Sequence, residues 1–418
     1  MLKDLFPKAY GRYLSLPKVG PVVEDFVSWL QEQGYRHRTR VLQVREIVQI
    51  ESFLRRRGFG NLCTIKSSDL EGCWTWYRRR NPNVASTVHV LQRFLEKRGL
   101  LAPSIPQSQS GITRKVSAYA DHLMEVRGFG RSAVRNHIFT ATRFLEHLKY
   151  QTVPSRLAAL STSDIEAFIR AAGKRLGRGS LGHTVAQLRG FLRFLASEGL
   201  VRPGLDQQID TPRLYRFEQL PRSLPWDTVR TFLQSIDRTT PVGLRNYAMF
   251  FLTATYGLRR SEIVALTLDD IDWRGRSLRI APQKNGYQLV LPLTDDVGDV
   301  LLEYLRHGRP TSSLRQLFLH MRAPAGALTP SAVTQTFRVL IKRSGLGIPV
   351  QGPHCLRHSY AAHLLRQGTS LKAIGDLLGH RMAESTAIYL RLAVEDLRGV
   401  ALPIPRESSK KDGKEVQL

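Results

Sequence analysis

Arginine, histidine and tyrosine side chains of the kind that bind anions and move protons occur in four short patterns in the second half of the chain. The first is Gly-Leu-Arg-Arg-Ser-Glu at 257–262, after an apolar stretch that predicts a buried helix. Gly257 would end that helix, and Ser261 would cap the next one with Glu262 in its first turn. Arg259 then lies in a tight joint between two buried helices. It could bind an anion there, or it could tether the joint through a carboxylate.

The second pattern is His-Cys-Leu-Arg-His at 354–358. A spacing of three places His354 and Arg357 on one face of a helix. The pair suits a phosphate, because the guanidinium fork matches two oxygens and the imidazole can donate or accept a proton. Taken alone, the pattern fits an ordinary surface pair equally well. We expect Cys355 to be a small buried residue rather than a nucleophile.

The third and fourth patterns are Leu-Leu-Gly-His at 377–380 and Thr-Ala-Ile-Tyr-Leu at 386–390. Gly379 is expected to end an amphipathic helix, and His380 could simply cap that helix. Tyr389 follows on a predicted helix whose apolar neighbours face a core. In isolation, Tyr389 is better explained as a core residue than as a catalytic one.

The elements predicted around these patterns are helices and a small sheet. Residues 272–280 read as strand, turn and strand, Asn285-Gly286 is a strong two-residue hairpin turn, and residues 288–292 supply the next strand. Helical periodicity resumes afterwards and continues to about Gly399. We therefore expect an α+β domain with a small antiparallel sheet at this end of the chain.

The charge of the chain limits its class. Its 418 residues include 62 lysines and arginines against 35 aspartates and glutamates, a formal net charge of +27. Such an excess is typical of proteins that bind nucleic acid or an anionic membrane surface. No apolar run approaches the roughly 18 residues of a membrane-spanning helix, and charged residues interrupt any N-terminal signal. Three cysteines, not spaced for zinc and odd in number, fit a reducing cytoplasm.

Two Pro-rich and polar stretches, at 103–111 and 203–225, read as linkers. They divide the chain into helical segments at 1–103 and 111–203, a mixed segment at 220–402 and a flexible charged tail at 403–418. The fold class expected is therefore multidomain and mainly α, with two all-α basic domains before the α+β domain.

The first two segments resemble a degenerate duplication. Both contain, in the same order, a helix ending at Gly-aromatic, an arginine-rich helix, a Ser-Asp helix start and a Phe-Leu ending that closes with Gly-Leu. The corresponding positions are 34–35 and 128–129, 40–54 and 135–148, 68–71 and 163–166, and 94–100 and 194–200. The alternative is that any two small helical bundles share such features.

Together, the order and spacing of the four patterns resemble those of the tyrosine recombinases, the phage integrase family that includes Xer-like site-specific recombinases. The resemblance covers the whole segment 220–402, and segment 111–203 is similar in pattern to the family's SAM-like core-binding domain. Segment 1–103 is additional. The resemblance implies an enzyme that cleaves and rejoins DNA strands through a covalent 3′-phosphotyrosyl intermediate.

Carried onto this sequence, the resemblance makes Arg259 and Arg357 paired clamps on the scissile phosphate. His354 and His380 would assist proton transfer and hydrogen bonding to it, and Tyr389 would attack.

The family also has a hairpin lysine that protonates the leaving 5′ oxygen, and Lys284 beside the Asn-Gly turn is the candidate. Only Lys342 competes between the first and second patterns, and it lies in a helical stretch. The chain departs from the family in the strand that follows, where Tyr-Gln-Leu-Val at 287–290 replaces the usual basic residues. Glu262 would be a supporting residue that orients its neighbours.

The partners expected are double-stranded DNA recombination sites, with self-association as a tetramer on paired sites and a place for partner recombinases. The site of action would be cytoplasmic and nucleoid-associated, in the integration or excision of a mobile element. We find no Gly-rich phosphate loop and no cluster of carboxylate metal ligands, so no cofactor, metal or ATP is expected. The alternatives are a type IB topoisomerase, a telomere resolvase, or a DNA-binding protein on a disabled recombinase scaffold.

Overall fold

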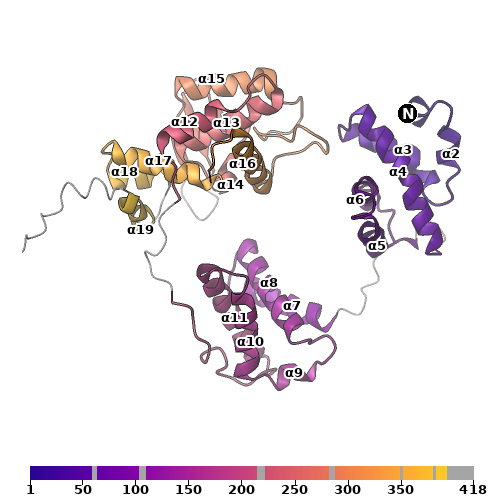
Figure 1. Cartoon of the computed structure of the whole chain (residues 1–418), viewed down its shortest axis with the longest axis horizontal. Helices are drawn as coiled ribbons and strands as arrows, with labels where there is room; N and C mark the ends of the chain where they lie inside the picture. The colour runs from indigo at the N-terminus through magenta and orange to yellow at the C-terminus, as the bar shows by residue number, and fades with distance from the viewer. Residues whose placement is uncertain are drawn as a thin grey trace, which may run out of the picture. The chain divides into compact units, whose positions relative to one another are not determined.

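A computed structural model describes most of the chain (Figure 1). The described residues are 1–58, 64–102, 110–213, 222–281, 288–348, 352–379 and 383–392. The chain divides into two compact units, one of residues 1–54, 81–87 and 219–418 and the other of residues 55–80 and 88–218. None of the helices in the described part has the length and apolar character needed to span a membrane.

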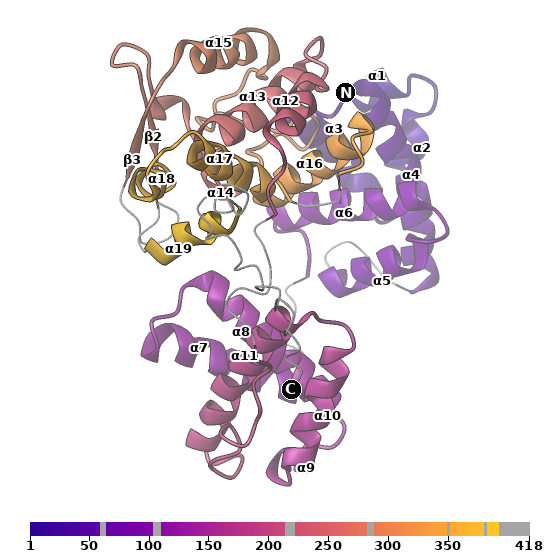
Figure 2. The same ribbon diagram turned by 60° about the vertical axis from the view of Figure 1, so that its left-hand side comes forward.

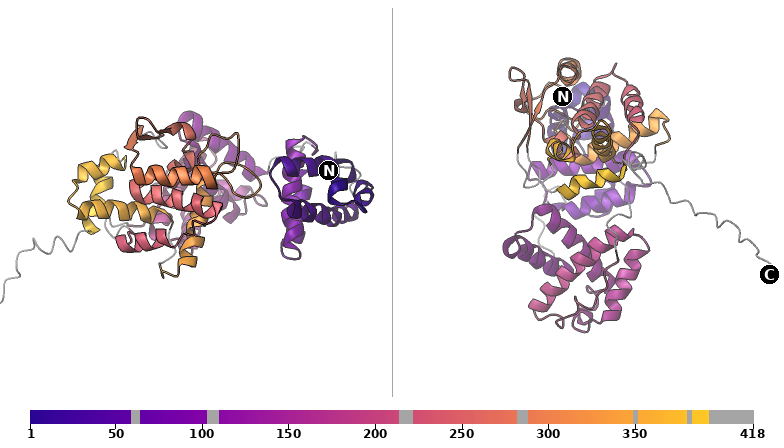
Figure 3. Two further views of the ribbon diagram at one scale, coloured as in Figure 1. Left: turned by 90° about the horizontal axis from the view of Figure 1, so that it is seen from above. Right: turned by 90° about the vertical axis from the view of Figure 1, so that its left-hand side faces the viewer.

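Residues 2–97 form short and long helices, as the sequence predicts. They are α1 (Leu2–Leu5), α2 (Tyr10–Leu14), α3 (Gly20–Glu32), α4 (His37–Arg56), α5 (Ser67–Tyr77) and α6 (Pro82–Lys97). The helices α1, α2 and α3, indigo in Figure 3, pack on one another. Buried Glu51 of α4 accepts hydrogen bonds from the backbone of Lys18 and Val19, and so fixes the start of α3.

Residues 111–197 form a second helical bundle. Its elements are α7 (Gly111–Asp121), the π-helix η2 (His122–Val126), α8 (Arg131–His147), α9 (Ser155–Ala158), α10 (Thr162–Gly173) and α11 (Arg178–Ser197). Packing of α8 against α7 and α11 buries a core that includes Tyr119, Phe144 and Phe191. We expected the start of α10 at Ser163-Asp164. Ser161 is the capping residue instead, because its hydroxyl and backbone both meet the Asp164 carboxylate.

Local structure recurs between these two helical segments. Gly99 and Gly199 both adopt left-handed backbone conformations, and the next residue in each segment, a leucine, donates to a carbonyl five residues earlier. Asp69 occupies the position of Asp164, because it is the third residue of its helix and accepts from the residue before that helix. The same helix ending also occurs at Tyr35 and Tyr150, and it is common among helices in general, so the duplication stays a prediction.

Residues 226–392 carry the four patterns. Their helices are α12 (Trp226–Gln234), α13 (Pro241–Tyr256), α14 (Arg260–Ala265), η3 (Leu268–Asp270), α15 (Asp295–Glu303), η4 (Tyr304–Gly308), α16 (Pro330–Ser344), α17 (His354–Arg366), α18 (Leu371–Leu377), α19 (Ala383–Ala387) and η5 (Ile388–Leu392). Helix α13 is mostly buried and contacts α12, α14, α15 and α17 (Figure 2). Its central position explains the unbroken apolar run that precedes Gly257.

The sheet is small and antiparallel, as expected. Strands β1 (Ile271–Asp272), β2 (Ser277–Ile280) and β3 (Leu289–Pro292) lie in the order β1-β2-β3. Leu278 pairs with Ile271 on one side and with Leu291 on the other, and all three are buried. The predicted Asn285-Gly286 turn lies outside the described residues. The mainly α fold with one small antiparallel sheet is confirmed.

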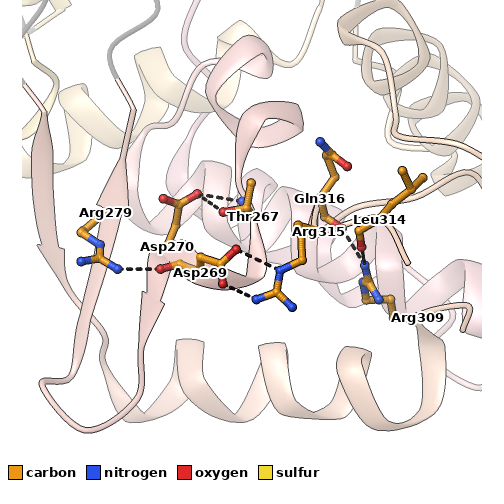
Figure 4. Close-up of polar contacts among 8 residues, drawn as sticks. All are labelled: Thr267, Asp269, Asp270, Arg279, Arg309, Leu314, Arg315 and Gln316. Carbon is orange, nitrogen blue, oxygen red and sulfur yellow. Dashed lines mark hydrogen bonds and ion pairs between the residues drawn. The ribbon is translucent and has the colours of Figure 1, made fainter. Parts of the chain in front are cut away.

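A polar network anchors the start of the sheet (Figure 4). Asp269 accepts from the Arg315 guanidinium through its carboxylate and from Arg279 through its carbonyl. The Arg309 guanidinium donates to the carbonyls of Leu314 and Gln316. Residues 309–329 are therefore irregular in structure, and they take part in two isolated β-bridges. Our expectation of continuous helical periodicity was wrong there.

Candidate active site

The turn between α13 and α14 places the first arginine. Helix α13 ends at Gly257, whose backbone is left-handed with a φ of 64°. A side-chain carbon at this position would lie 2.6 Å from Leu378 and 2.9 Å from Tyr360, so only glycine fits the turn. Leu258 is buried beside it. The chain therefore turns sharply and presents Arg259 from a rigid joint.

Arg259 is held by Glu262. The buried Glu262 carboxylate accepts from the Arg259 backbone N–H at 2.7 Å and from its Nη1 at 2.7 Å. Our expectation that Ser261 caps α14 was wrong, because Arg259 is the residue that precedes the helix and Ser261 lies within its first turn. The Arg259 side chain remains 39% exposed. It is thus tethered through a carboxylate and still open to an anion.

Arg357 is a buried cation rather than a surface residue. It is 2% exposed, and it donates from Nη1 to the Gly257 carbonyl at 2.7 Å and from Nη2 to the Leu378 carbonyl at 2.5 Å. Burial, followed by the positive charge of Arg259, lowers its pKa to about 10, while the Glu262 carboxylate opposes that shift. Arg357 therefore remains charged at neutral pH.

Tyr389 lies on η5, which packs against α17, and it is 1% exposed. It belongs to a small apolar cluster with Ala361, Ile374 and Leu378. The Arg357 guanidinium lies close to its hydroxyl. Burial raises the pKa of Tyr389, and the charges of Arg357 and Arg259 act in the opposite direction. Tyr389 is therefore a core residue by burial, and its hydroxyl is nevertheless beside the buried arginine.

His354 is the first residue of α17, and it is exposed. Loss of water around its ring, then the positive charges of Arg357 and Arg259, lower the pKa of His354. The imidazole is thus uncharged at neutral pH and can accept as well as donate a hydrogen bond.

Sequence reasoning missed His358 as a site residue. Its Nδ1 lies 3.1 Å from the Tyr389 hydroxyl, and its ring meets that of His354 at 4.4 Å in an edge-on arrangement. The signal was the spacing of four residues between the two histidines, which places both on one helical face.

Two other predicted site residues, Lys284 and His380, lie outside the described residues. Cys355 is a small buried residue, as expected, and burial raises the pKa of its thiol to about 12, so the thiol stays protonated at neutral pH.

Among the described residues, the structure thus gathers two fixed guanidiniums, two imidazoles and one phenol. Guanidiniums stabilise charge on non-bridging phosphate oxygens without reorganising. A phenol can attack phosphorus once its proton is removed. This set of groups suits the cleavage of a phosphodiester.

Comparison with known proteins gives the family. Residues 222–396 match the Phage integrase family, and residues 116–199 match the phage integrase N-terminal SAM-like domain. A Sinorhizobium fredii protein named as an integrase/recombinase, y4rA, is 33% identical over 94% of this chain and 97% of its own length. The tyrosine recombinase XerD of Mycobacterium tuberculosis is 31% identical over 68% of this chain and 95% of its own.

Solved structures show the same fold. The chain is similar to the XerH site-specific recombinase in a post-cleavage complex with its difH substrate, with a TM-score of 0.54 and 20% identity over 74% of this chain and 93% of that one. It is also similar to the Tn1549 transposon integrase bound to circular intermediate DNA, with a TM-score of 0.52 and 18% identity over 68% and 98%. The chain belongs to the phage integrase family of tyrosine recombinases, enzymes of site-specific DNA recombination.

Proposed function

We propose that Tyr389 attacks the scissile phosphate of a DNA recombination site while Arg259 and Arg357 bind its non-bridging oxygens. The observation that carries this assignment is that Tyr389, only 1% exposed, lies close enough to buried Arg357 and half-exposed Arg259 for both positive charges to act on the pKa of its phenol. The two positive charges favour the phenolate that forms as Tyr389 attacks.

The remaining roles follow from the chemistry of the step. Negative charge that builds up on the phosphate oxygens needs fixed cations. An uncharged His354 at the start of α17 can hydrogen-bond to one of those oxygens. His380 is proposed to do the same. The leaving 5′ oxygen needs a proton, which we assign to Lys284. The covalent 3′-phosphotyrosyl link conserves the bond energy, so rejoining consumes no nucleotide.

Glu262 is proposed as a positioning residue for Arg259. Its two hydrogen bonds hold both the backbone and the guanidinium of that arginine. Arg260 and Arg338 line an open polar hollow at the start of α16, next to the same joint. Basic groups there suit the flanking phosphates of a DNA strand.

The proposed substrate is double-stranded DNA, on which segments 111–203 and 220–402 act as separate domains that contact one half-site. The net charge of +27 supports contact with DNA backbone. Further, we propose a tetramer on paired sites, with or without partner recombinases, acting on the nucleoid in the integration or excision of a mobile element. The integrase and transposon names among the relatives favour this role over DNA relaxation by a topoisomerase or hairpin formation by a resolvase.

The test separates transition-state contact from simple DNA binding. Arg259→Ala and Arg357→Lys should each slow cleavage of a nicked suicide substrate by about a hundredfold or more. Affinity for the half-site should fall much less, because many other basic residues contact the backbone. Arg306→Ala, an exposed arginine of η4, is the control and should leave both unchanged. Equal losses of affinity and rate would mean that the two arginines only hold DNA.

A further inference from the structure

The imidazole in contact with the nucleophile is not the one that the family pattern assigns to the phosphate. Nδ1 of His358 lies 3.1 Å from the Tyr389 hydroxyl, and the two ring centres are 5.6 Å apart. This is hydrogen-bond distance, so His358 touches the reacting oxygen itself.

The position of His358 is set by helix α17. It follows the buried Arg357 directly, and it is one helical turn after His354, against whose ring its own ring packs edge-on. His358 is half-buried, and Tyr389 is 1% exposed. The pair is therefore fixed by packing of η5 on α17 and not by a chance approach of two surface side chains.

Tyr389 needs a proton acceptor. The ordinary pKa of a tyrosine is about 10, and burial raises it here, against the opposing charges of Arg357 and Arg259. The phenol is thus protonated at neutral pH. Neither arginine can accept that proton, since a guanidinium has donors only.

We propose that His358 accepts the proton of Tyr389 as the phenol attacks DNA, and returns it when the strand is rejoined. This rests on the proposed role of Tyr389 as nucleophile. In cleavage, the Tyr389 Oη–H proton passes to Nδ1 of His358, the Oη–P bond forms and the bond between phosphorus and the 5′ oxygen breaks. The leaving oxygen takes its proton from the general acid assigned to Lys284. In rejoining, the imidazolium protonates the departing phenolate.

This assignment divides the work between the two histidines of α17. His358 serves the nucleophile as its general base. His354, one turn earlier and exposed at the start of the helix, is left to the phosphate. Both need to be uncharged before cleavage, and for His354 burial of the ring, followed by the charges of the nearby arginines, lowers the pKa and so favours that state.

The test replaces the base while keeping a hydrogen-bond acceptor. The Asn side chain in His358→Asn places an amide near the position of Nδ1, and that amide accepts a hydrogen bond but not a proton. Single-turnover cleavage of a nicked suicide substrate by the full chain should fall by roughly 10²–10⁴-fold. The control is His363→Asn, on the same helix and stacked on Trp226, which should cleave at the wild-type rate.

A more acidic nucleophile separates a base from a residue that only positions Tyr389. With 3,5-difluorotyrosine incorporated at position 389, the phenol loses its proton far more readily, so the defect of His358→Asn should shrink to less than about tenfold. An undiminished defect, or wild-type cleavage by His358→Asn with ordinary tyrosine, overturns the proposal. If the Asn variant melts well below the control, His358→Gln is compared in the same way.

The role of Tyr389 as the nucleophile is tested separately from the role of His358. A covalent complex that still maps to residue 389 while His358→Asn behaves as wild type removes only the role of His358. Covalent product from a chain lacking the tyrosine hydroxyl would remove the proposed function itself, and with it this inference.

Discussion

Arg357 donates a hydrogen bond from Nη1 to the carbonyl oxygen of Gly257 at 2.7 Å, although the two residues are far apart in the sequence. The bond joins helix α17 to the turn that presents Arg259. A second bond from the same guanidinium reaches Leu378 at the end of α18, and η5 with Tyr389 packs on α17. One buried guanidinium thus joins α17 to the turn that presents Arg259 and to the end of α18, and α17 also supports the element that carries Tyr389.

Gly257→Ala should damage this connection without removing any active-site side chain. The added carbon would lie 2.6 Å from Leu378 in a left-handed turn, so we expect a loss of about 1–3 kcal/mol in the free energy of unfolding and a marked loss of cleavage. Gly298→Ala, where nothing lies within 4 Å of the added carbon, is the control. Thermal melting and suicide-substrate cleavage check both. Wild-type cleavage by Gly257→Ala would show that the turn does not set the geometry of Arg259 and Arg357.

Glu262→Gln should leave Arg259 in place but less firmly oriented. The amide keeps one acceptor and loses the charge that binds the guanidinium, so cleavage should slow by on the order of tenfold to a hundredfold with little change in DNA affinity. Glu303→Gln, which breaks a pair with Arg238 on the surface, should be neutral in both assays. A Glu262 variant that binds DNA poorly and cleaves bound DNA normally would assign this carboxylate to binding.

Lys284→Ala should be rescued by a substrate whose 5′ leaving group is sulfur, because a thiolate departs without a proton. On the ordinary oxygen substrate the variant should be strongly impaired. Lys342→Ala, the exposed lysine of α16, should cleave both substrates normally. Failure of the sulfur substrate to restore cleavage would make Lys284 structural, and another acid would have to be sought.

The arginines of segment 1–103 are predicted to extend the surface that binds DNA. Arg36, Arg38 and Arg45 are all exposed. Replacing the three with alanine should flatten the dependence of log affinity on log salt by roughly 0.9 for each DNA phosphate that the variant no longer neutralises. Suicide cleavage should be largely intact. An unchanged slope with unchanged recombination would mean that these arginines only face solvent, and an unchanged slope without recombination would indicate protomer assembly.

The sequence predicted the mainly helical fold with its small antiparallel sheet, because the patterns there are local. Gly257 marked the turn, and the order of the patterns identified Arg259, Arg357 and Tyr389 as a set. The expectation that Ser261 caps α14 was wrong. The Glu262 carboxylate accepts the hydrogen bond from the Arg259 backbone N–H at the helix start instead.

What escaped prediction depends in part on tertiary contacts. Segment 309–329 contains Pro310, Pro324 and Gly326, which disfavour a helix, and the expectation of continuous helix overlooked them. The guanidinium of Arg309 donates hydrogen bonds to carbonyls of the segment instead. His358 is the last residue of the second pattern, but the sequence assigned it no role. Its contact with Tyr389 depends on how η5 packs against α17, and no spacing within either element specifies that packing.

The most direct test of the account is covalent capture by Tyr389→Phe on a nicked suicide substrate. The variant lacks only the hydroxyl, so it should bind the half-site like the wild type and trap no DNA. Tyr360→Phe, a packing residue of the same cluster, should form the 3′-phosphotyrosyl complex normally. A covalent complex with the Tyr389→Phe variant would contradict the assignment of the nucleophile.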